Sequence, residues 1–129
     1  MPRNMSFAMT TPQFLARSKT VTRRFGWRFV KPGDVVCGVE KSRGLKRGEK
    51  IKRLGLIRIV STRREPLGAI TVAEMAPEGM SDTAPDDFVA RLCRHYGVAP
   101  GTPVNRIEFE YLDLAPTPSS RRRAADSSR

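Results

Sequence analysis

The alternation of apolar and charged residues in VNRIEFEYL, at residues 104–112, constrains the fold more than any other feature of the sequence. Ile107, Phe109 and Tyr111 fall on one face of an extended chain and charged side chains fall on the other, which predicts a half-exposed strand. Residues 54–62 have apolar side chains on both faces, which predicts a strand buried on both sides near a barrel wall. Shorter strands are predicted around residues 5–9, 20–23 and 35–40.

Residues 85–96 show the clearest helical pattern, because an apolar stripe recurs at helical spacing and Gly97 follows it. Thr83 and Asp86 resemble a capping box at the start of this helix. Two shorter helices are predicted, after Thr11 and over residues 72–76. The connections between these elements are too short for a wound parallel sheet. We therefore predict an α+β fold, a small mixed β-barrel flanked by short helices and one longer helix.

The chain of 129 residues carries a formal net charge of +11, and this charge is unevenly distributed. Residues 17–64 contain sixteen Lys and Arg against three acidic residues. A positive field this concentrated attracts polyanions, of which nucleic acid is the commonest in the cytoplasm. The charge therefore favours contact with nucleic acid or a nucleotide, with a merely solvated basic face as the alternative.

Much of this charge lies in KSRGLKRGEKIKR, residues 41–53, which holds seven basic residues and two glycines. Its low apolar content predicts a long exposed loop or ribbon tip on which a phosphate backbone would lie. The candidate nucleic-acid contacts in it are Lys41, Arg43, Lys46, Arg47 and Lys50. From residue 115 the composition turns to Pro, Ser, Ala and Arg. We predict one domain over residues 1–114 and a disordered tail over residues 115–129.

Metal, cofactor and membrane chemistry find little support in the sequence. The two cysteines, Cys37 and Cys93, form no CxxC pair, and a helix would point His95 away from Cys93. We therefore expect no metal site and no cofactor. No apolar run approaches the length of a membrane span, and the first residues lack the apolar core of a signal peptide, so we expect a cytoplasmic protein without membrane contact. The sequence does not indicate an oligomeric state.

Four motifs follow one another along the chain: SKTVTRRFGW at residues 18–27, KPGD at 31–34, EGM at 78–80 and RIEFEYL at 106–112. In their joint order and spacing they resemble the ASCH domain family, a branch of the PUA-like β-barrel superfamily, from about Phe7 to Leu112. The nearest pattern is that of small bacterial N4-acetylcytidine amidohydrolases and phage-encoded relatives. The resemblance implies a PUA-like barrel whose cleft binds RNA, DNA or a modified nucleoside, and for some members it implies hydrolysis.

The same resemblance implies site residues. The reactive lysine of the amidohydrolases falls on Lys19, their reactive threonine on Thr22 in the same K-T-x-T pattern, and their glutamate on Glu78. Arg24 matches an arginine that lines the cleft, and Arg23 beside it is a further candidate for substrate contact. Many ASCH members without known amidohydrolase activity have an acidic residue where Thr22 stands. Threonine at this position therefore favours the hydrolytic group.

Amide hydrolysis sets conditions on these residues. A threonine hydroxyl is a poor nucleophile unless a base takes its proton, and a lysine serves as base only if burial or nearby positive charge lowers its pKa. Arg23, Arg24 and Arg17 are in sequence positions to supply that charge. A close pair with Glu78 would instead keep Lys19 protonated, as an electrostatic stabiliser. Both roles of Lys19 stay open. Residues three apart in a strand point to opposite faces, so Lys19 and Thr22 share a pocket only if Lys19 precedes the strand or a bulge intervenes.

Trp27 is the only tryptophan, and with Phe25 and Phe29 it is a candidate stacking surface for a base; core packing is the alternative. Two features depart from the family pattern. Arg17 stands where glycine is common, and the basic stretch at 41–53 is longer than in the compact amidohydrolases, which suits a polymer better than a free nucleoside. Two further functions stay open. One is a noncatalytic nucleic-acid-binding module, and the other is a ribonuclease whose cleft cations stabilise a phosphorane.

Overall fold

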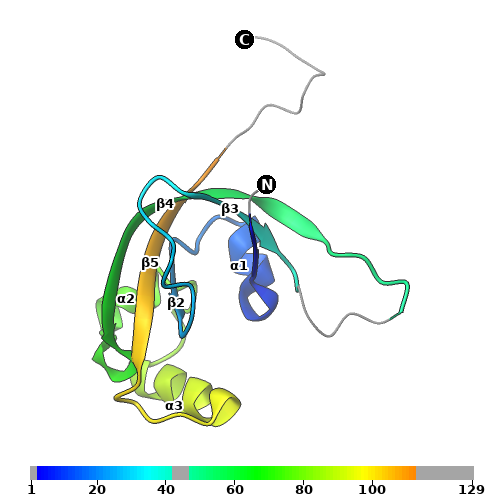
Figure 1. Cartoon of the computed structure of the whole chain (residues 1–129). Coiled ribbons are helices and arrows are strands. Elements are labelled where there is room, and N and C mark those ends of the chain that lie inside the picture. Colours follow the sequence, from blue (N-terminus) through cyan, green and yellow to red (C-terminus); the bar gives the residue numbers. More distant parts are fainter. Residues whose placement is uncertain (1–2, 42–46, 113–129) are drawn as a thin grey trace.

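A computed structural model describes residues 3–41 and 47–112, and its centre is one five-stranded sheet. The strands are β1 (Arg3–Ser6), β2 (Val21–Arg24), β3 (Val35–Val39), β4 (Arg53–Pro66) and β5 (Pro103–Tyr111). They lie in the order β1-β3-β4-β5-β2, and only β1 and β3 run parallel. The long strand β4 pairs first with β3 and then with β5, so the sheet curls into a half-barrel whose edges are β1 and β2 (Figure 1).

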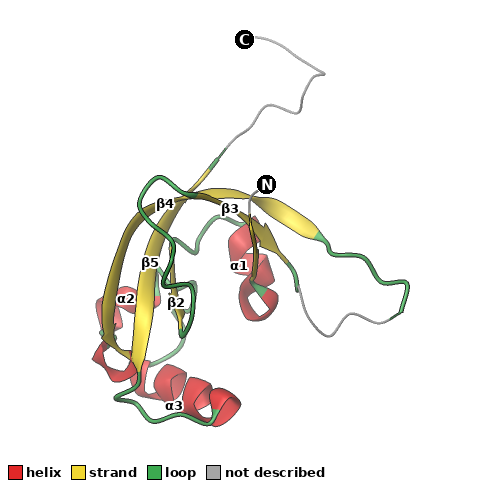
Figure 2. Ribbon diagram, viewed as in Figure 1, coloured by secondary structure: helices red, strands yellow, loops and turns green. Residues whose placement is uncertain are grey.

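The helices lie in two groups (Figure 2). After β1 the chain forms the 3-10 turn η1 (Ala8–Thr10) and the helix α1 (Thr11–Leu15), which lies under the arch of the sheet. After β4 it forms η2 (Leu67–Ala69), α2 (Val72–Met75) and α3 (Pro85–Tyr96), which lie at the other end of the half-barrel. A space therefore remains between α1 and α3.

Each group of helices packs on its own apolar cluster. The first cluster lies between the sheet and α1, where the Phe14 ring packs against the rings of Phe7 and Tyr111. A Cβ added at Gly38 of β3 would lie 2.4 Å from the Phe14 ring, so α1 approaches the sheet this closely only over glycine. The second cluster packs α3 against η2 and α2.

These elements confirm the predicted fold class, a small α+β half-barrel with short helices and one longer helix. The helix α3 has the bounds that the sequence predicts, and Gly97 ends it in the left-handed conformation with φ of 68°. The predicted capping box is wrong. The N-cap is Ala84, because Pro85 already occupies the first helical position.

Two predicted strands differ from the structure. The first strand stops at Ser6, and the chain turns into η1, which leaves Met9 about half exposed. β4 is buried on one side only: Ile57 and Ile59 are buried, whereas Val60 is 44% exposed. The helix α1 packs under the arch of the sheet, on the side of Ile57 and Ile59, so the outer face of β4 meets solvent. The predicted tail at 115–129 and the domain boundary at 114 lie outside the described residues.

Candidate functional site

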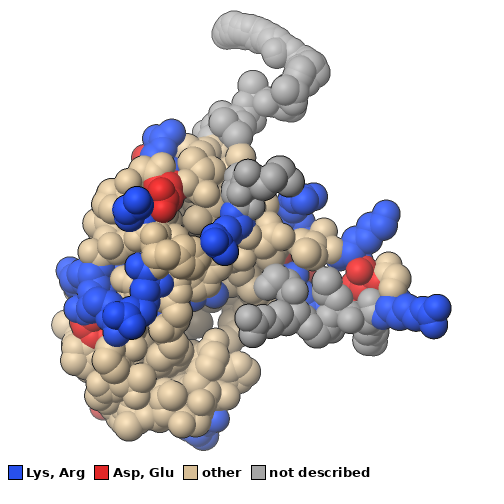
Figure 3. All heavy atoms as spheres, viewed as in Figure 1, with Lys and Arg blue, Asp and Glu red and all other residues tan. Residues whose placement is uncertain are grey.

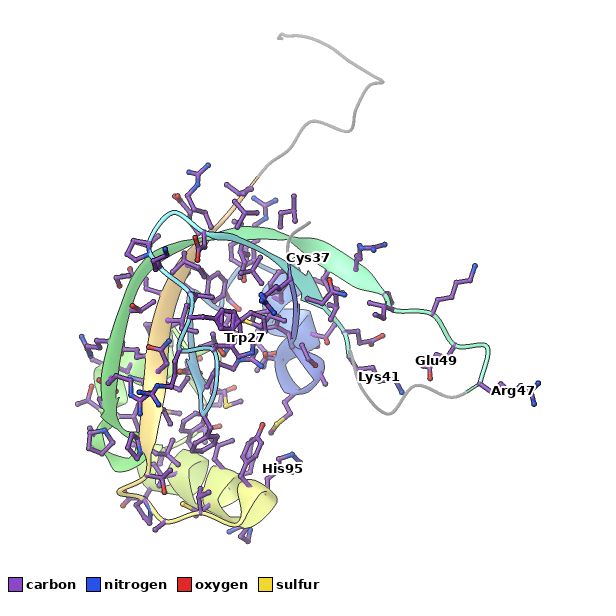
Figure 4. All side chains as sticks on the ribbon, in the orientation of Figure 1. Trp27, Cys37, Lys41, Arg47, Glu49 and His95 are labelled. Carbon is purple, nitrogen blue, oxygen red and sulfur yellow. The ribbon has the colours of Figure 1, made fainter. Side chains whose placement is uncertain are left out.

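A cleft of about 610 Å³ lies in the space under the arch. One side comes from the end of β1 and from η1, and the other from β2 and the residues that follow it. Trp27 on that second side and His95 on α3 lie across the cleft from one another (Figure 4). Segments far apart in the sequence therefore meet at one cavity.

Lys19, Thr22 and Glu78 all line this cleft, and each is less than 5% exposed. Lys19 precedes β2, whereas Thr22 lies within it, so the geometric condition for a shared pocket is met without a bulge. The Lys19 Nζ donates to the backbone carbonyl of Glu78 at 2.8 Å and to its Oε1 at 3.0 Å. The structure thus brings together the three residues that the family resemblance selects.

Backbone contacts hold Lys19 beside Glu78. The amides of Thr20 and Val21 donate to the Pro77 carbonyl at 2.7 and 3.0 Å. The Tyr111 hydroxyl donates to the Lys19 carbonyl at 2.6 Å. The chain at residue 19 is therefore fixed from both sides, by the segment that carries Glu78 and by the end of β5.

Arg17 leads into this segment with φ of 60°, in the left-handed region that glycine takes without strain. This conformation accounts for glycine at the matching position of the resembling family. An arginine here keeps the turn at a cost of about 1 kcal/mol. The departure therefore preserves the backbone that presents Lys19.

The side chain of Arg23 is fully buried and joins three carboxylates. Its Nη1 donates to Glu78 Oε2 at 2.7 Å, and its Nη2 reaches Glu74 at 2.8 Å and Glu65 at 3.0 Å. Burial lowers the pKa of Arg23, but hydrogen bonds and charges from the three carboxylates outweigh it, so the net shift is upward. Arg23 lines the cleft, yet most of its donors are committed to protein carboxylates.

Arg24 makes a different set of contacts. Its Nε donates to Thr22 Oγ1 at 3.0 Å, and its Nη2 donates to the Ser6 carbonyl at 2.6 Å, so it bridges the two edge strands of the half-barrel. Its guanidinium also lies 4.9 Å from the centre of the Phe7 ring. Burial lowers the pKa of Arg24 to about 10. Both acceptors of these hydrogen bonds are neutral oxygens, so they do not neutralise the positive charge of Arg24, which lies beside Thr22 in the cleft.

The electrostatics around Lys19 act in opposite directions. Burial lowers its pKa, and the positive charges of Arg24 and Arg23 lower it further. The charge and hydrogen bond of Glu78 raise it, but the net shift is downward. A larger fraction of Lys19 is therefore neutral near pH 7 than in an exposed lysine.

Trp27 forms part of the cleft wall and packs partly against the first apolar cluster, so part of its surface is core packing, and stacking of a base on its ring stays a prediction. It has φ of 63°, which is unusual for a bulky residue. The buried side chain of Asn105 donates through Nδ2 to the Trp27 carbonyl at 2.8 Å. Phe25 packs against Tyr96 of α3, with ring centres 4.9 Å apart, on another part of the wall.

Three of the five predicted loop contacts lie in the described part of the chain, away from this wall. In the described part of the chain, Lys41, Arg47 and Lys50 do not line the cleft; Lys41 forms an ion pair with Glu49 at 3.3 Å. Arg47 and Lys50 are exposed, and Lys and Arg gather along this extended segment and over β4 (Figure 3). Arg43 and Lys46 lie outside the described residues.

Sequence reasoning missed the residues that support the site. Asn105, Tyr111, Glu65 and Glu74 reach it from β4, β5 and α2, and no local motif marks them. Within residues 3–41 and 47–112, no group of three or more His, Cys, Asp or Glu is placed to hold a metal ion. In the same part of the chain, no helix has the length and apolar content needed to cross a membrane.

Comparison with known proteins rests on structure alone. No family model matches the chain, and no curated protein matches it. The crystal structure of an Enterococcus faecalis V583 protein of the family DUF984 is similar with a TM-score of 0.64 and 15% identity, covering 90% of this chain and 83% of that one. An ASCH domain from Lactobacillus crispatus JV V101 is similar with a TM-score of 0.57 and 15% identity, covering 84% and 78%. The fold is therefore that of an ASCH domain, as the sequence resemblance predicts.

Proposed function

We propose that the cleft binds the base of RNA, DNA or a free nucleoside and hydrolyses an acyl amide on its exocyclic nitrogen, as in N4-acetylcytidine. The observation that carries this proposal is the burial of Lys19, Thr22 and Glu78 in the lining of one cleft, with the pKa of Lys19 lowered. A buried lysine with a lowered pKa in a cleft is typical of a reactive site.

Thr22 is the nucleophile. Its Oγ1 accepts a hydrogen bond from Arg24, so the hydroxyl proton is directed to another acceptor, and the nearby cation stabilises the alkoxide that forms. Neutral Lys19 takes this proton while Oγ1 attacks the acyl carbon. Donors of Arg24 that are not used by Thr22 and Ser6 stabilise the oxyanion of the tetrahedral intermediate.

Breakdown of the intermediate cleaves the carbon–nitrogen bond. Lys19 returns the proton to the leaving exocyclic nitrogen, and the acyl group remains on Thr22 as an ester. A water molecule then attacks the ester carbon, with Lys19 taking its proton; the bond between this carbon and Thr22 Oγ1 breaks, Lys19 passes the proton to Oγ1, and the carboxylic acid leaves. Glu78 holds the Lys19 Nζ through two oxygens and so fixes the base in place.

The test is release of acetate from N4-acetylcytidine, free and within a short RNA. Thr22→Val removes only the hydroxyl, and we expect it to lower kcat by at least about 100-fold, the usual minimum for loss of an essential catalytic group. Thr22→Ser retains a hydroxyl and should retain activity. Thr20→Val is the matched control, because Thr20 is exposed and lies outside the cleft lining.

Lys19→Met tests the base, and circular dichroism checks that each variant folds. Turnover by Thr22→Val close to that of the unmodified protein would exclude Thr22 as the nucleophile. Cleavage of RNA that contains no modified base, with no release of acetate, would instead support a ribonuclease.

A second candidate is a nucleic-acid-binding module without catalysis. It is favoured because exposed basic residues lie on a segment apart from the cleft. Arg47 and Lys50 are exposed on a segment that extends from the half-barrel, where they are free to approach a phosphate backbone. This function requires affinity for RNA or DNA that falls steeply with salt. Replacing both residues with glutamine should reduce the slope of log K against log salt by about 1.4 to 1.8, and an unchanged slope would argue against it.

A further inference from the structure

Three planar groups lie next to one another in a row that runs from the cleft wall toward the surface. Trp27 lines the cleft, and the centre of its ring lies 5.2 Å from that of Phe29, with 32° between the planes. The Arg3 guanidinium lies 4.6 Å from the centre of the Phe29 ring. Phe29 is half exposed and Arg3 is exposed, so the outer part of the row faces solvent. We refer to Trp27, Phe29 and Arg3 as the aromatic platform.

The inner end of the platform is held rigidly and under strain. Gly26 would take a positive φ without cost, yet it is Trp27 that adopts it. Such a conformation persists only where the surrounding structure fixes it, and the hydrogen bond from buried Asn105 to the Trp27 carbonyl does so. A platform that is already ordered loses little conformational entropy when a ligand stacks on it.

Positive charge accompanies the platform. Arg3 belongs to it, and Arg28 and Lys31 lie within two residues of Phe29 in the sequence; all three are exposed. Exposed aromatic rings combined with cations are the features with which proteins bind single-stranded nucleic acid, since bases stack on the rings and phosphates approach the cations. A free nucleoside in the cleft would leave Phe29 and Arg3 unused.

We propose that the aromatic platform binds the nucleotide next to the one whose base enters the cleft, so the preferred ligand is a single-stranded oligonucleotide rather than a free nucleoside. The identity of the group in the cleft rests on the proposed function. The exposed guanidinium of Arg3 is the outermost plane of the platform and supplies the surface on which the flanking base stacks, and the Phe29 ring beneath it holds that guanidinium in place.

The single tryptophan gives a direct assay, because quenching of Trp27 fluorescence reports binding at the cleft wall. The full chain is titrated with cytidine 3′,5′-bisphosphate and with a cytidine trinucleotide, which carries phosphate together with neighbouring bases. Stacking of one flanking base should make the trinucleotide bind roughly 5- to 150-fold more tightly. Isothermal calorimetry repeats the comparison, in case a variant changes the fluorescence itself.

The ratio of the two affinities is the quantity to compare among variants. Arg3→Gln removes the outermost cationic plane and should bring the ratio close to one, and Phe29→Leu retains apolar bulk without the ring that supports Arg3 and should lower the ratio. Arg91→Gln is the matched control, since Arg91 is an exposed arginine on α3 that lies outside the cleft lining, and it should leave the ratio unchanged. A ratio that Arg3→Gln does not change would overturn the proposal.

Two further outcomes separate this proposal from the function of the cleft. If a duplex binds as tightly as the single strand of the same sequence, the affinity comes from general electrostatic attraction and not from stacking, and the proposal is refuted. Because the ligands carry no acyl group, a preference for the trinucleotide would stand even if no acylated base is hydrolysed. Hydrolysis of N4-acetylcytidine without any preference for the trinucleotide would refute the platform and leave the proposed function intact.

Discussion

Arg23 is the residue whose replacement most directly tests how the site is held together. Its buried side chain lies between the carboxylates of Glu65, Glu74 and Glu78. Arg23→Met retains an unbranched stem and removes the charge. Glu65 retains Arg63 and Glu74 retains Arg106 as partners, but among the described residues Glu78, whose side chain is 3% exposed, retains only Lys19 as a charged partner.

The cost follows from this burial. Removing one partner of a buried ion pair costs about 3–5 kcal/mol, and here Glu78 keeps the hydrogen bond from Lys19 but loses the charge of Arg23 in a medium of low polarity. At about 4 °C per kcal/mol for a domain of this size, the melting temperature should fall by about 12–20 °C. Arg63→Met is the matched control, since Arg63 pairs with the same Glu65 at 2.8 Å but its side chain is 58% exposed. Its loss should cost less than about 1 kcal/mol.

Thermal denaturation at pH 7 measures both variants. The double variant Arg23→Met with Glu78→Gln should recover part of the lost stability, because it removes the stranded carboxylate as well. If Arg23→Met and Arg63→Met lower the melting temperature equally, or if Glu78→Gln rescues nothing, the buried network does not have the energetic role inferred from its geometry.

Three other outcomes are expected. The hydrogen bond from Arg106 first, and then that from Arg23, hold the pKa of Glu74 down to about 2 against burial. The stability that Glu74 contributes is therefore complete above about pH 4.5 and is lost as the pH falls toward 2. Urea denaturation measures the free energy of unfolding at pH 6 and at pH 3, and the difference between these two values should be smaller for Glu74→Gln than for the unmodified protein. Equal differences in the two proteins would contradict this. Gly38→Ala forces a Cβ to 2.4 Å from the Phe14 ring and should cost about 1–3 kcal/mol, whereas Gly55→Ala, with its Cβ at 3.6 Å, should cost clearly less in the same denaturation assay. Tyr111→Phe removes the hydrogen bond to the cleft backbone and should cost about 1 kcal/mol, with a lower kcat for amide hydrolysis if that backbone positions the base.

Regular elements were predictable where a pattern repeats within a short stretch. The helix α3 and the strand β5 have sequence periods that a single buried face imposes, so their bounds could be predicted without knowledge of the rest of the chain. The alternation at residues 5–9 was misleading, because the Phe7 amide bonds to the Val39 carbonyl and the chain then turns into η1. Such a turn depends on where the neighbouring strand ends, which the local pattern does not contain.

The site residues also fall into two groups. Lys19, Thr22 and Glu78 could be selected only through the resemblance to a family, because their spacing alone does not distinguish them from ordinary strand, surface and loop residues. Asn105 and Tyr111 could not be selected at all, since they contact Trp27 and Lys19 across 78 and 92 residues of chain. Nothing in the local sequence at either position separates them from ordinary strand residues.

By itself the sequence determined the regular local elements and the concentration of charge, because each depends on neighbouring residues. Only the tertiary structure decided which of the many basic residues serve the cleft. Arg23 and Arg63 both lie in strands, yet the side chain of Arg23 is buried among three carboxylates, whereas that of Arg63 is exposed to solvent. The curl of the sheet sets that difference, because burial and pairing depend on distances through space, and those distances determine the pKa values and energies of the charges.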